Sequence, residues 1–335
     1  MIKRYSKEIQ KDLDLFVRRW QDPGVLDMEA STSGSTGSPK IISIPKSSMK
    51  VSASISNQFF GLQKGMNVML CMPMQSIAAQ MLVVRSILAK ANLVVVKPQK
   101  DPFVEISKEE KVDFVSLTPY QLAHILQNTT SKEKLKQVSI ILLGGAPLSI
   151  AMEGELIKWN NRIYLSYGMT ETLSHIALRE IAPIHSDVFR LLPGYQIQTS
   201  DSGASIRVPW SDSLLKTSDI LELETDQSFR VLGRCDNVIN SGGVKIFPEE
   251  LEHCLSNIID CPYCVTYKSH KSLGSAVALM TEEPIDIQKI ERVLRKVNPH
   301  FIPKYYFVHK IPRVKNGKID RQMAAEIVAD LDENR

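Results

Sequence analysis

A run of small hydroxylated residues near the N-terminus carries a dense set of groups that could bind phosphate. Residues 31–40 read STSGSTGSPK and contain six hydroxyl side chains, two glycines and one lysine. Glycine lets backbone N–H groups converge on an anion, hydroxyls add further donors, and the lysine adds positive charge. The run is therefore typical of a loop that cradles phosphates. Its candidate binding residues are Thr32, Ser33, Gly34, Ser35, Thr36, Gly37 and Lys40.

Better-known phosphate motifs do not describe this run. A Walker A loop has four residues between its glycines and a Lys-Ser or Lys-Thr pair directly after the second glycine. Here Gly34 and Gly37 are separated by two residues, and no GxGxxG pattern is present. Taken alone, the run is equally compatible with a flexible Gly/Ser linker.

Four further segments contain glycine, and three of them combine it with polar or charged residues. Two of them, 144–146 (GGA) and 167–172 (YGMTET), each follow a predicted strand. Nucleotides bind at the carboxyl ends of strands in α/β sheets, so these two segments are expected to face one site. The other two are 233–236 (GRCD) and 312–318 (PRVKNGK), and the last places Lys318 on a turn that contains glycine.

The elements that must position these segments follow from the apolar periodicity. Short apolar runs at 68–72, 93–96, 112–117, 138–143 and 163–165 alternate with helix-period segments. Helices are expected over 77–89, from Pro119 after a Thr118 cap, and over 149–159. Strands that alternate with helices predict parallel βαβ units.

The rest of the chain follows other patterns. Residues 5, 9, 13, 16 and 20 are apolar, which predicts a helix over the first twenty residues that docks on the body. After Pro183, short strands at 205–208, 220–223 and 229–232 form a β-rich appendix. Beyond Arg234, strands at 265–268 and 276–280 and helices opened by Pro248, Ile285 and Asp320 form a small α+β unit.

The fold class predicted is therefore α/β, in two unequal domains. Residues 1–235 form a body with a parallel βαβ sheet and the β-rich appendix, and residues 236–335 form a cap domain. With 335 residues, of which 43% are hydrophobic, the chain is long enough for two cores.

Charge and composition exclude several classes of function. Lys plus Arg is 41 and Asp plus Glu is 37, spread along the chain, so neither nucleic acid nor a membrane surface is an expected partner. The most apolar stretch, 77–96, is interrupted by Gln80, Arg85, Lys90 and Asn92, so no membrane span is expected. The N-terminal residues do not resemble a signal peptide, which favours a cytoplasmic protein. The oligomeric state stays open between monomer and homodimer.

The five cysteines favour reduced thiols over a disulfide framework, since their number is odd and they are scattered. Only Cys261 and Cys264 have the spacing of metal ligands. A zinc site there would need two further ligands from Cys254, His253 or His270, without a second pair at fixed spacing. Buried thiols are the favoured interpretation.

Together and in this order, these segments resemble the signatures of the adenylate-forming superfamily of acyl-CoA synthetases, adenylation domains and luciferases. The resemblance covers residues 31 to about 321 and depends on the hydroxyl-rich loop, YGMTE, GRxDxxI and the NGK lysine. It implies an ATP-dependent ligase that joins a carboxylic acid to AMP with release of pyrophosphate, then transfers the acyl group to coenzyme A. It also implies Mg²⁺ as a cofactor.

The resemblance implies a role for each matched residue. The 32–40 loop would hold the β- and γ-phosphates, Thr170 the α-phosphate and Glu171 the Mg²⁺ ion. Residues 144–146 (Gly144, Gly145, Ala146) with Tyr167 and Gly168 would enclose the adenine, and Asp219, supported by Arg234, would bind the ribose. Lys318 would neutralise charge during adenylation, Asp236 would be the hinge, and 241–245 would approach the thiol.

The resemblance extends to one subfamily, the compact bacterial o-succinylbenzoate-CoA ligases of menaquinone synthesis. The residues that carry it are YGMTETLSHIALR and NVINSGGVK. Such a substrate has a second carboxylate, which needs a buried cation or several donors. His175 and Arg85 are candidates, although a helix arginine is more often solvated. Gln75 and Ser76 stand where many members have an aromatic residue or histidine, so their role in the acid pocket is open.

Two other functions remain compatible with the sequence. One is an enzyme that adenylates another acid for CoA or a separate carrier protein, and the other is a non-catalytic nucleotide-binding paralogue. Lys40, Glu171, Asp219, Arg234 and Lys318 are all present, which favours an active enzyme. Family members carry a large subdomain before the hydroxyl-rich loop, so the body here is expected to be shortened at its N-terminus.

Overall fold

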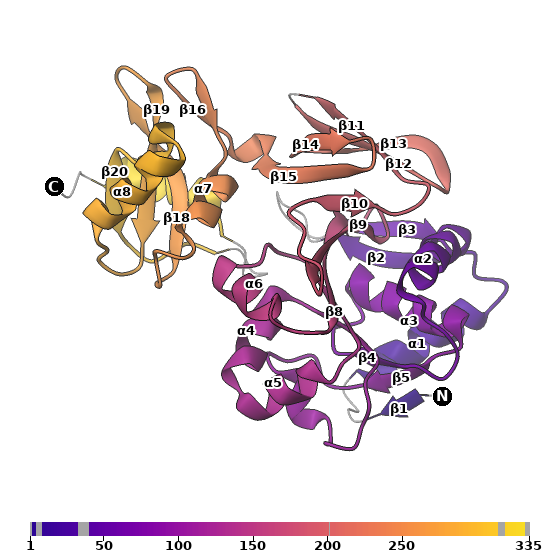
Figure 1. Cartoon of the computed structure of the whole chain (residues 1–335). Coiled ribbons are helices and arrows are strands. Elements are labelled where there is room, and N and C mark those ends of the chain that lie inside the picture. The colour runs from indigo at the N-terminus through magenta and orange to yellow at the C-terminus, as the bar shows by residue number, and fades with distance from the viewer. Residues whose placement is uncertain (1, 5–8, 33–39, 201, 314–318, 332–335) are drawn as a thin grey trace.

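The structure is a computed structural model, and it describes residues 2–4, 9–32, 40–200, 202–313 and 319–331 (Figure 1). A ten-stranded sheet lies at the centre of the body, in the order β1-β5-β4-β6-β7-β8-β9-β10-β15-β14. The strands are β1 (Ile2–Arg4), β4 (Asn67–Leu70), β5 (Asn92–Val95), β6 (Phe114–Leu117), β7 (Ile140–Leu143), β8 (Arg162–Met169), β9 (Ser174–Ala182), β10 (Phe189–Leu191), β14 (Asp219–Thr225) and β15 (Ser228–Arg234).

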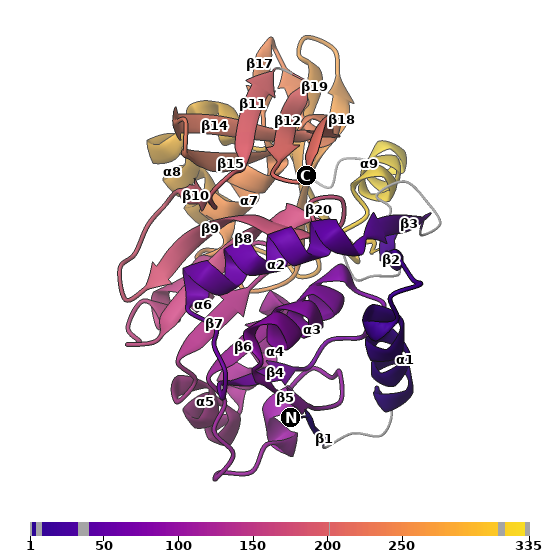
Figure 2. The same cartoon turned by 90° about the vertical axis from the view of Figure 1, so that its right-hand side faces the viewer.

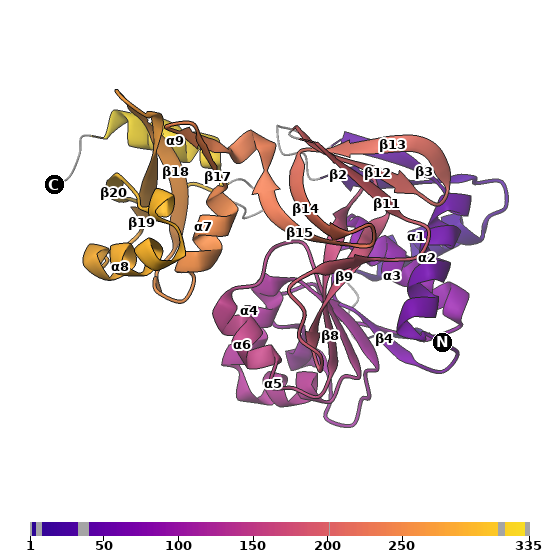
Figure 3. The same cartoon turned by 45° about the horizontal axis from the view of Figure 1, so that its top comes forward.

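The half of the sheet from β1 to β8 is parallel, as the alternation of strands and helices predicted. All four residues of β6 and of β7 are buried, because helices cover both faces of this half. One side carries α1 (Gln10–Gln21), α2 (Lys46–Phe60) and α3 (Ile77–Ala89), and the other carries α4 (Pro119–Gln127), α5 (Thr129–Lys136) and α6 (Ile150–Leu156) (Figure 3).

Local capping explains where two of these helices begin. Thr118 and Gln121 form a reciprocal capping box with Pro119 at the first position of α4. Ser149 accepts a hydrogen bond from the Met152 backbone N–H and opens α6. Both caps come directly after a parallel strand or its loop, so they fix where the chain turns back over the sheet.

The N-terminal segment differs from the prediction of a single helix. Helix α1 begins only at Gln10, and Ile2–Arg4 form an edge strand parallel to β5. A strand at this position pairs backbone groups that β5 would otherwise leave open at the edge. The docking prediction is confirmed, because Leu13, Phe16 and Trp20 are buried against the body. Residue 5 lies outside the described residues.

The β-rich appendix is only partly separate from the main sheet. Strands β14 and β15 extend the main sheet in antiparallel fashion, joined through β10 and β9. A second, three-stranded sheet contains β11 (Gln196–Ser200), β12 (Gly203–Val208) and β13 (Ser211–Thr217), and a hairpin contains β2 (Asp27–Thr32) and β3 (Lys40–Pro45). The apolar runs predicted β12, β14 and β15 but not β10, β11 and β13.

The C-terminal region forms its own small α+β unit beside β14 and β15 (Figures 1 and 2). Its sheet contains β16 (Ile239–Ser241), β17 (Val244–Ile246), β18 (Tyr263–His270), β19 (Gly274–Thr281) and β20 (Tyr305–Val308). Its helices are α7 (Pro248–Leu255), α8 (Ile287–Val297) and α9 (Arg321–Asp330). Its hydrophobic clusters lie within residues 239–328, apart from the body cluster that spans residues 9–229. Strand β20, parallel to β19, was not predicted.

No helix among the described residues has the length and apolar character needed to cross a membrane.

Candidate active site

Gly144 lies at the carboxyl end of β7, as the sequence predicted. Its backbone N–H donates to the Leu117 carbonyl at the end of β6, so the loop starts between two parallel strands. A Cβ at Gly144 would collide with the Ser166 hydroxyl of β8. Gly145 has a φ of 90° and, with Ala146, is exposed. The glycines thus let an open stretch of backbone lie directly beside β8, where a flat ligand could approach it.

Tyr167, Asp219 and Arg234 form the best-defined polar cluster of the site. The Tyr167 hydroxyl donates to Oδ2 of Asp219 at 2.7 Å, and Nη1 of Arg234 donates to Oδ1 at 3.2 Å. Asp219 and Arg234 face each other across β14 and β15. Burial and the adjacent Asp219 charge raise the pKa of Tyr167, so its hydroxyl remains a donor. One carboxylate therefore joins the last parallel strand of the sheet to its antiparallel edge.

The position of Tyr167 corrects one detail of the sequence prediction. Tyr167 and Gly168 were expected after the end of a strand, but both lie inside β8, which continues to Met169. The antiparallel partner β9 makes this extension possible, since it pairs Gly168 with His175. A Cβ at Gly168 would collide with the Ser174 carbonyl, so the close approach of β9 explains the glycine.

A strained turn follows β8 and carries Thr170 and Glu171. The Thr172 hydroxyl accepts from the Met169 N–H at 2.9 Å and contacts the Ser174 carbonyl. Leu173 and Ser174 adopt φ values of 55° and 81°, which are costly for residues other than glycine. Glu171 projects as an exposed residue. Thr172, Leu173 and Ser174 belong to the YGMTETLSHIALR run, but none of them was assigned a role of its own from the sequence, although they shape this turn.

The hydroxyl-rich segment joins the two strands of a hairpin. Strands β2 and β3 pair antiparallel, with Thr32 opposite Lys40. Ser33, Gly34, Ser35, Thr36 and Gly37 lie outside the described residues. The Gln80 side chain, on α3, donates to the Glu29 carbonyl at 2.9 Å and ties β2 to the body.

The expected hinge residue lies next to the Arg234 cluster. Asp236 belongs to a 3₁₀ turn, Cys235–Asn237, and accepts from Nη2 of Arg234 at 2.7 Å. That hydrogen bond lowers the pKa of Asp236. The 241–245 segment is a hairpin between β16 and β17, with Gly242 and Gly243 at positive φ.

Lys318 itself lies outside the described residues, but its flanks are placed. Arg313 and Ile319 form a β-bridge, and the Asp320 N–H donates to the Pro312 carbonyl at 2.9 Å. Asp320 then caps α9 through the Met323 N–H. The described residues on the two sides of the NGK segment, Arg313 and Ile319, are therefore neighbours in the fold.

Arg85 and His175 differ most from the ordinary expectation for their residue types. A helix arginine is most often solvated, yet Arg85 on α3 is 1% exposed and His175 on β9 is 2% exposed. Nη2 of Arg85 donates to Nδ1 of His175 at 3.4 Å. Because Nδ1 accepts, Nε2 carries the proton of the neutral ring and donates to the Ser56 hydroxyl at 3.0 Å.

The charge of Arg85 has no carboxylate partner among the described residues. Its Nε and the Asn57 Oδ1 are buried without a hydrogen-bond partner. Burial lowers the pKa of Arg85 to about 10, and burial together with the Arg85 charge lowers the pKa of His175 well below its usual value. A buried guanidinium without an acid is costly and suits an anion supplied from outside.

Ser56, which completes this cluster, was not predicted from the sequence. Helix α2, which carries it, was not predicted. Ser48, Ser52 and Ser56 recur every four residues and are all buried. That spacing is typical of one face of a helix and could have indicated a polar buried stripe.

Gln75 and Ser76 are engaged in local structure. Ser76 caps α3 by accepting from the Ala79 N–H, and its hydroxyl donates to the Pro73 carbonyl. The Gln75 side chain donates to Asp12 of α1 at 2.8 Å. Ser76 therefore serves as a helix cap, and Gln75 helps to dock α1 on the body.

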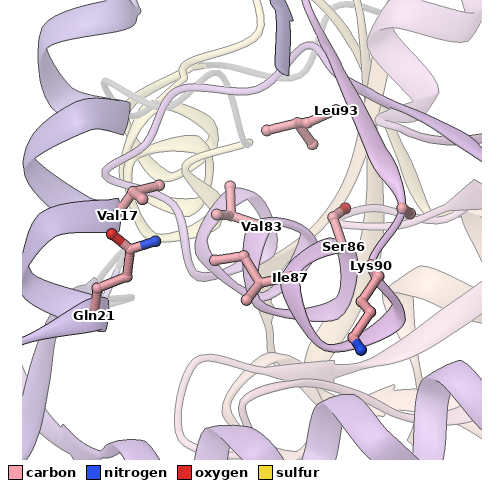
Figure 4. A pocket seen from close by; sticks show the side chains of 8 residues that line it. Val17, Gln21, Val83, Ser86, Ile87, Lys90 and Leu93 are labelled. Carbon is pink, nitrogen blue, oxygen red and sulfur yellow. The ribbon is translucent and has the colours of Figure 1, made fainter. Parts of the chain in front are cut away.

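A pocket of about 280 Å³ lies between α1 and α3, with Val17 and Gln21 on one wall and Val83, Ser86 and Ile87 on the other (Figure 4). None of the residues singled out from the sequence lines it. Because Arg85 points instead toward His175 on β9, this pocket is separate from the polar cluster described above.

Protein ligands for a metal do not gather in the described part of the chain, where no group of three or more His, Cys, Asp or Glu could hold an ion. The five cysteines are free, and Cys71 and Cys264 are buried. A Mg²⁺ ion at Glu171 would therefore need phosphate oxygens to complete its coordination, which is the mode this ion prefers.

The comparisons with known proteins agree with this fold. The model of the family described as AMP-binding enzyme matches residues 31–206. The chain belongs to this family. Its fold is the adenylate-forming α/β fold with a smaller C-terminal domain, as in solved acyl-CoA synthetase structures.

Among curated proteins, the chain is similar to the 2-succinylbenzoate–CoA ligases. The protein of that name from Lactococcus lactis is 26% identical over 315 residues, which cover 87% of this chain and 69% of that protein. The one from Salmonella typhimurium is 29% identical over 267 residues, which cover 74% of this chain and 56% of that protein.

Two solved structures show the same arrangement of elements. An AMP-forming acyl-CoA synthetase-like protein from Dyadobacter fermentans has a TM-score of 0.65 at 28% identity, and the match covers 96% of this chain and 95% of that one. The o-succinylbenzoate CoA synthetase from Bacillus subtilis, in complex with its acyl-adenylate intermediate, has a TM-score of 0.76 at 20% identity. That match covers 92% of this chain and 69% of the other.

Proposed function

We propose that this chain is an ATP-dependent acid–thiol ligase that adenylates o-succinylbenzoate and transfers the acyl group to coenzyme A. The observation that carries the proposal is the Tyr167–Asp219–Arg234 cluster beside the Gly144 loop, in a chain of the AMP-binding enzyme family. The similarity to 2-succinylbenzoate–CoA ligases supports the choice of acid. Because the proposed substrates are ATP and CoA, we also propose a cytoplasmic location.

The geometry suits a nucleoside monophosphate moiety. The exposed backbone at Gly145 and Ala146 and the ring of Tyr167 form two walls that would enclose the adenine. From the described residues of this cluster Asp219 accepts two hydrogen bonds, and a carboxylate has about four acceptor positions. It can therefore accept the ribose hydroxyls as well.

The negative charge of adenylation needs cations and donors around it. Thr170 and the 32–40 loop would hold phosphate oxygens, and Glu171, exposed on its turn, would hold Mg²⁺. When bound, Mg²⁺ would neutralise phosphate charge. Lys318, on the segment closed by Arg313 and Ile319, would stabilise the charge that develops between the carboxylate and the α-phosphate.

Arg85 and His175 suit the second carboxylate of the acid. Arg85 is buried and lacks an acidic partner among the described residues, while o-succinylbenzoate brings a free carboxylate into the body. An ion pair with Arg85 would offset the cost of burying both charges. His175 would hold the guanidinium in place through Nδ1, with Ser56 fixing its tautomer.

The two half-reactions require two arrangements of the cap. We place the domain boundary after residue 235 and the hinge at Asp236, and the separate hydrophobic clusters on either side support this division. Rotation there would withdraw Lys318 and bring the glycine hairpin at 242–243 toward the site. Positive φ at both glycines suits close approach of a thiol-bearing arm.

The experiment that tests the proposal is acid-dependent ATP–pyrophosphate exchange with a panel of carboxylic acids. We expect exchange with o-succinylbenzoate and much weaker exchange with benzoate, which lacks the second carboxylate. Strong exchange with fatty or amino acids and none with o-succinylbenzoate would assign another acid. ATP binding without exchange for any acid would instead indicate a non-catalytic nucleotide-binding protein.

A further inference from the structure

A buried ion pair outside the residues assigned above joins α6 to β9. Glu153 of α6 is 8% exposed, and its two carboxylate oxygens accept from Nη1 and Nη2 of Arg179 at 2.6 and 2.8 Å. Nε2 of His185 lies 2.7 Å from the same carboxylate, and Nη1 of Arg179 also donates to the Ser186 carbonyl at 3.2 Å. Two parallel hydrogen bonds fix both the distance and the orientation of the pair.

The environment of Glu153 keeps this pair ionised. Burial alone would raise the pKa of Glu153, but the hydrogen bonds and charges of Arg179 and His185 lower it. A buried pair of this kind is weak evidence for stability, because desolvation offsets much of the attraction. The rigid geometry of the pair is therefore better explained by what it holds in place, namely α6 against β9.

The pair connects the two walls proposed to enclose the adenine. On one side, α6 follows the 144–148 loop directly, so Glu153 anchors the helix that ends this loop. On the other side, Arg179 is paired with Leu165 of β8, two residues before Tyr167. The distance between the loop and Tyr167 thus depends on how α6 is held against β9.

Arg179 also supports the Tyr167 ring through an aromatic contact. Its guanidinium lies over the Phe189 ring, 6.0 Å from the centroid. The Phe189 centroid is 6.0 Å from that of Tyr167, and Phe229 lies edge-on to Tyr167 at 5.2 Å. A shift of Arg179 would therefore move the packing behind Tyr167.

We propose that Glu153 and Arg179 are positioning residues for recognition of the adenine base. The pair holds the Gly144–Ala146 loop and the Tyr167 ring at the separation that an adenine requires. This inference rests on the proposed function, because it assigns the two walls to the nucleotide.

The test compares Glu153→Gln and Arg179→Lys with a matched control on the same helix. Glu155, also on α6, pairs with Lys132 at 2.7 Å on the opposite side, so Glu155→Gln removes an ion pair without touching β9. The readouts are the KM for ATP, the KM for the acid and the preference for ATP over ITP in kcat/KM. Thermal unfolding of every variant reports whether it is folded.

We expect Glu153→Gln and Arg179→Lys to raise the KM for ATP by about tenfold and to lower the preference for ATP over ITP by a similar factor. In these two variants the KM for the acid should change by less than about twofold. In the Glu155→Gln control, the KM for ATP, the KM for the acid and the base preference should all change by less than about twofold. A purely structural pair would lower Tm and active fraction but leave base preference at the wild-type value, and that result would overturn the proposal.

ATP binding by the wild-type protein, measured by calorimetry without acid, distinguishes a failure of the proposed function from a failure of the positioning role. If the wild-type chain binds no ATP, the proposed function fails. If it binds ATP but Arg179→Lys binds ATP and ITP in the wild-type ratio, only the positioning role fails. Should Glu153→Gln not fold, the Arg179→Lys variant, which keeps the positive charge, decides the question.

Discussion

The Tyr167 hydroxyl on β8 donates a 2.7 Å hydrogen bond to the Asp219 carboxylate on β14. Arg234 donates to the other oxygen of the same carboxylate and also to Asp236, the expected hinge. The proposed ribose site and the proposed hinge therefore share one guanidinium. A change in hinge conformation would act directly on the residue that supports Asp219.

Replacing Tyr167 by Phe removes the hydroxyl and keeps the ring. A hydrogen bond to a charged group contributes about 1.5–3 kcal/mol, so the KM for ATP should rise about tenfold or more while the KM for the acid stays near its wild-type value. Steady-state kinetics with each substrate varied in turn measure this. An unchanged KM for ATP would separate Tyr167 from nucleotide binding.

Lys318→Ala should abolish adenylation and leave the thiol step largely intact. The reason is that Lys318 is proposed to stabilise charge only while the acid and the α-phosphate react. ATP–pyrophosphate exchange measures the first step, and thioester formation from supplied acyl-adenylate measures the second.

Asp236→Pro provides the complementary variant, since proline restricts the backbone at the proposed hinge. It should retain exchange and lose thioester formation. Loss of both steps in both variants would argue against cap rotation as the event that separates them.

Arg85→Met should stabilise the protein and impair recognition of the acid. Replacing a buried charge that lacks an acid by an apolar side chain of similar length can add about 1–3 kcal/mol. Denaturant unfolding should show the gain, and the KM for o-succinylbenzoate should rise while that for ATP does not. A destabilised variant with normal kinetics would assign Arg85 a structural role instead.

His175 should make stability depend on pH near neutrality. Burial and then the Arg85 charge lower the pKa of His175 well below 6.5, so the folded state keeps it neutral. Below about pH 6.5 the unfolded chain binds a proton that the folded chain does not, and stability falls as pH drops. Above that pH the effect disappears.

Urea unfolding between pH 7 and pH 5 measures this dependence. The His175→Gln variant should lose less stability over the range than the wild-type chain, whereas His300→Gln, at an exposed position, should follow the wild type. Equal slopes for all three proteins would contradict the assignment of a neutral buried His175.

Local patterns predicted much of the fold because local physics determined it. Helix α3 has the predicted bounds of 77–89, and the Thr118 cap and the Asp320 cap begin their helices where expected. The burial of both faces produces the continuous apolar runs of β6 and β7. The helix bounds and caps depend on neighbours within a few residues, and the apolar runs are visible in the sequence itself, so one sequence is enough to indicate them.

The parts of the fold and the site that depend on long-range pairing could not be predicted from the sequence. Strand β9 reads as SHIALREIA, and its antiparallel pairing with β8 keeps Tyr167 and Gly168 of β8 within the sheet. Likewise, nothing local distinguishes Arg85 from a solvated helix arginine. Its burial results from α2 and β9, which lie 28 and 90 residues away at Asn57 and His175.

The most direct test of the central claim is to measure AMP and acyl-CoA together in one reaction with ATP, Mg²⁺, CoA and o-succinylbenzoate. We predict one AMP for each thioester formed, and no thioester when the acid is omitted. Formation of ADP in place of AMP, or AMP without thioester at saturating CoA, would contradict an acid–thiol ligase that works through an acyl-adenylate.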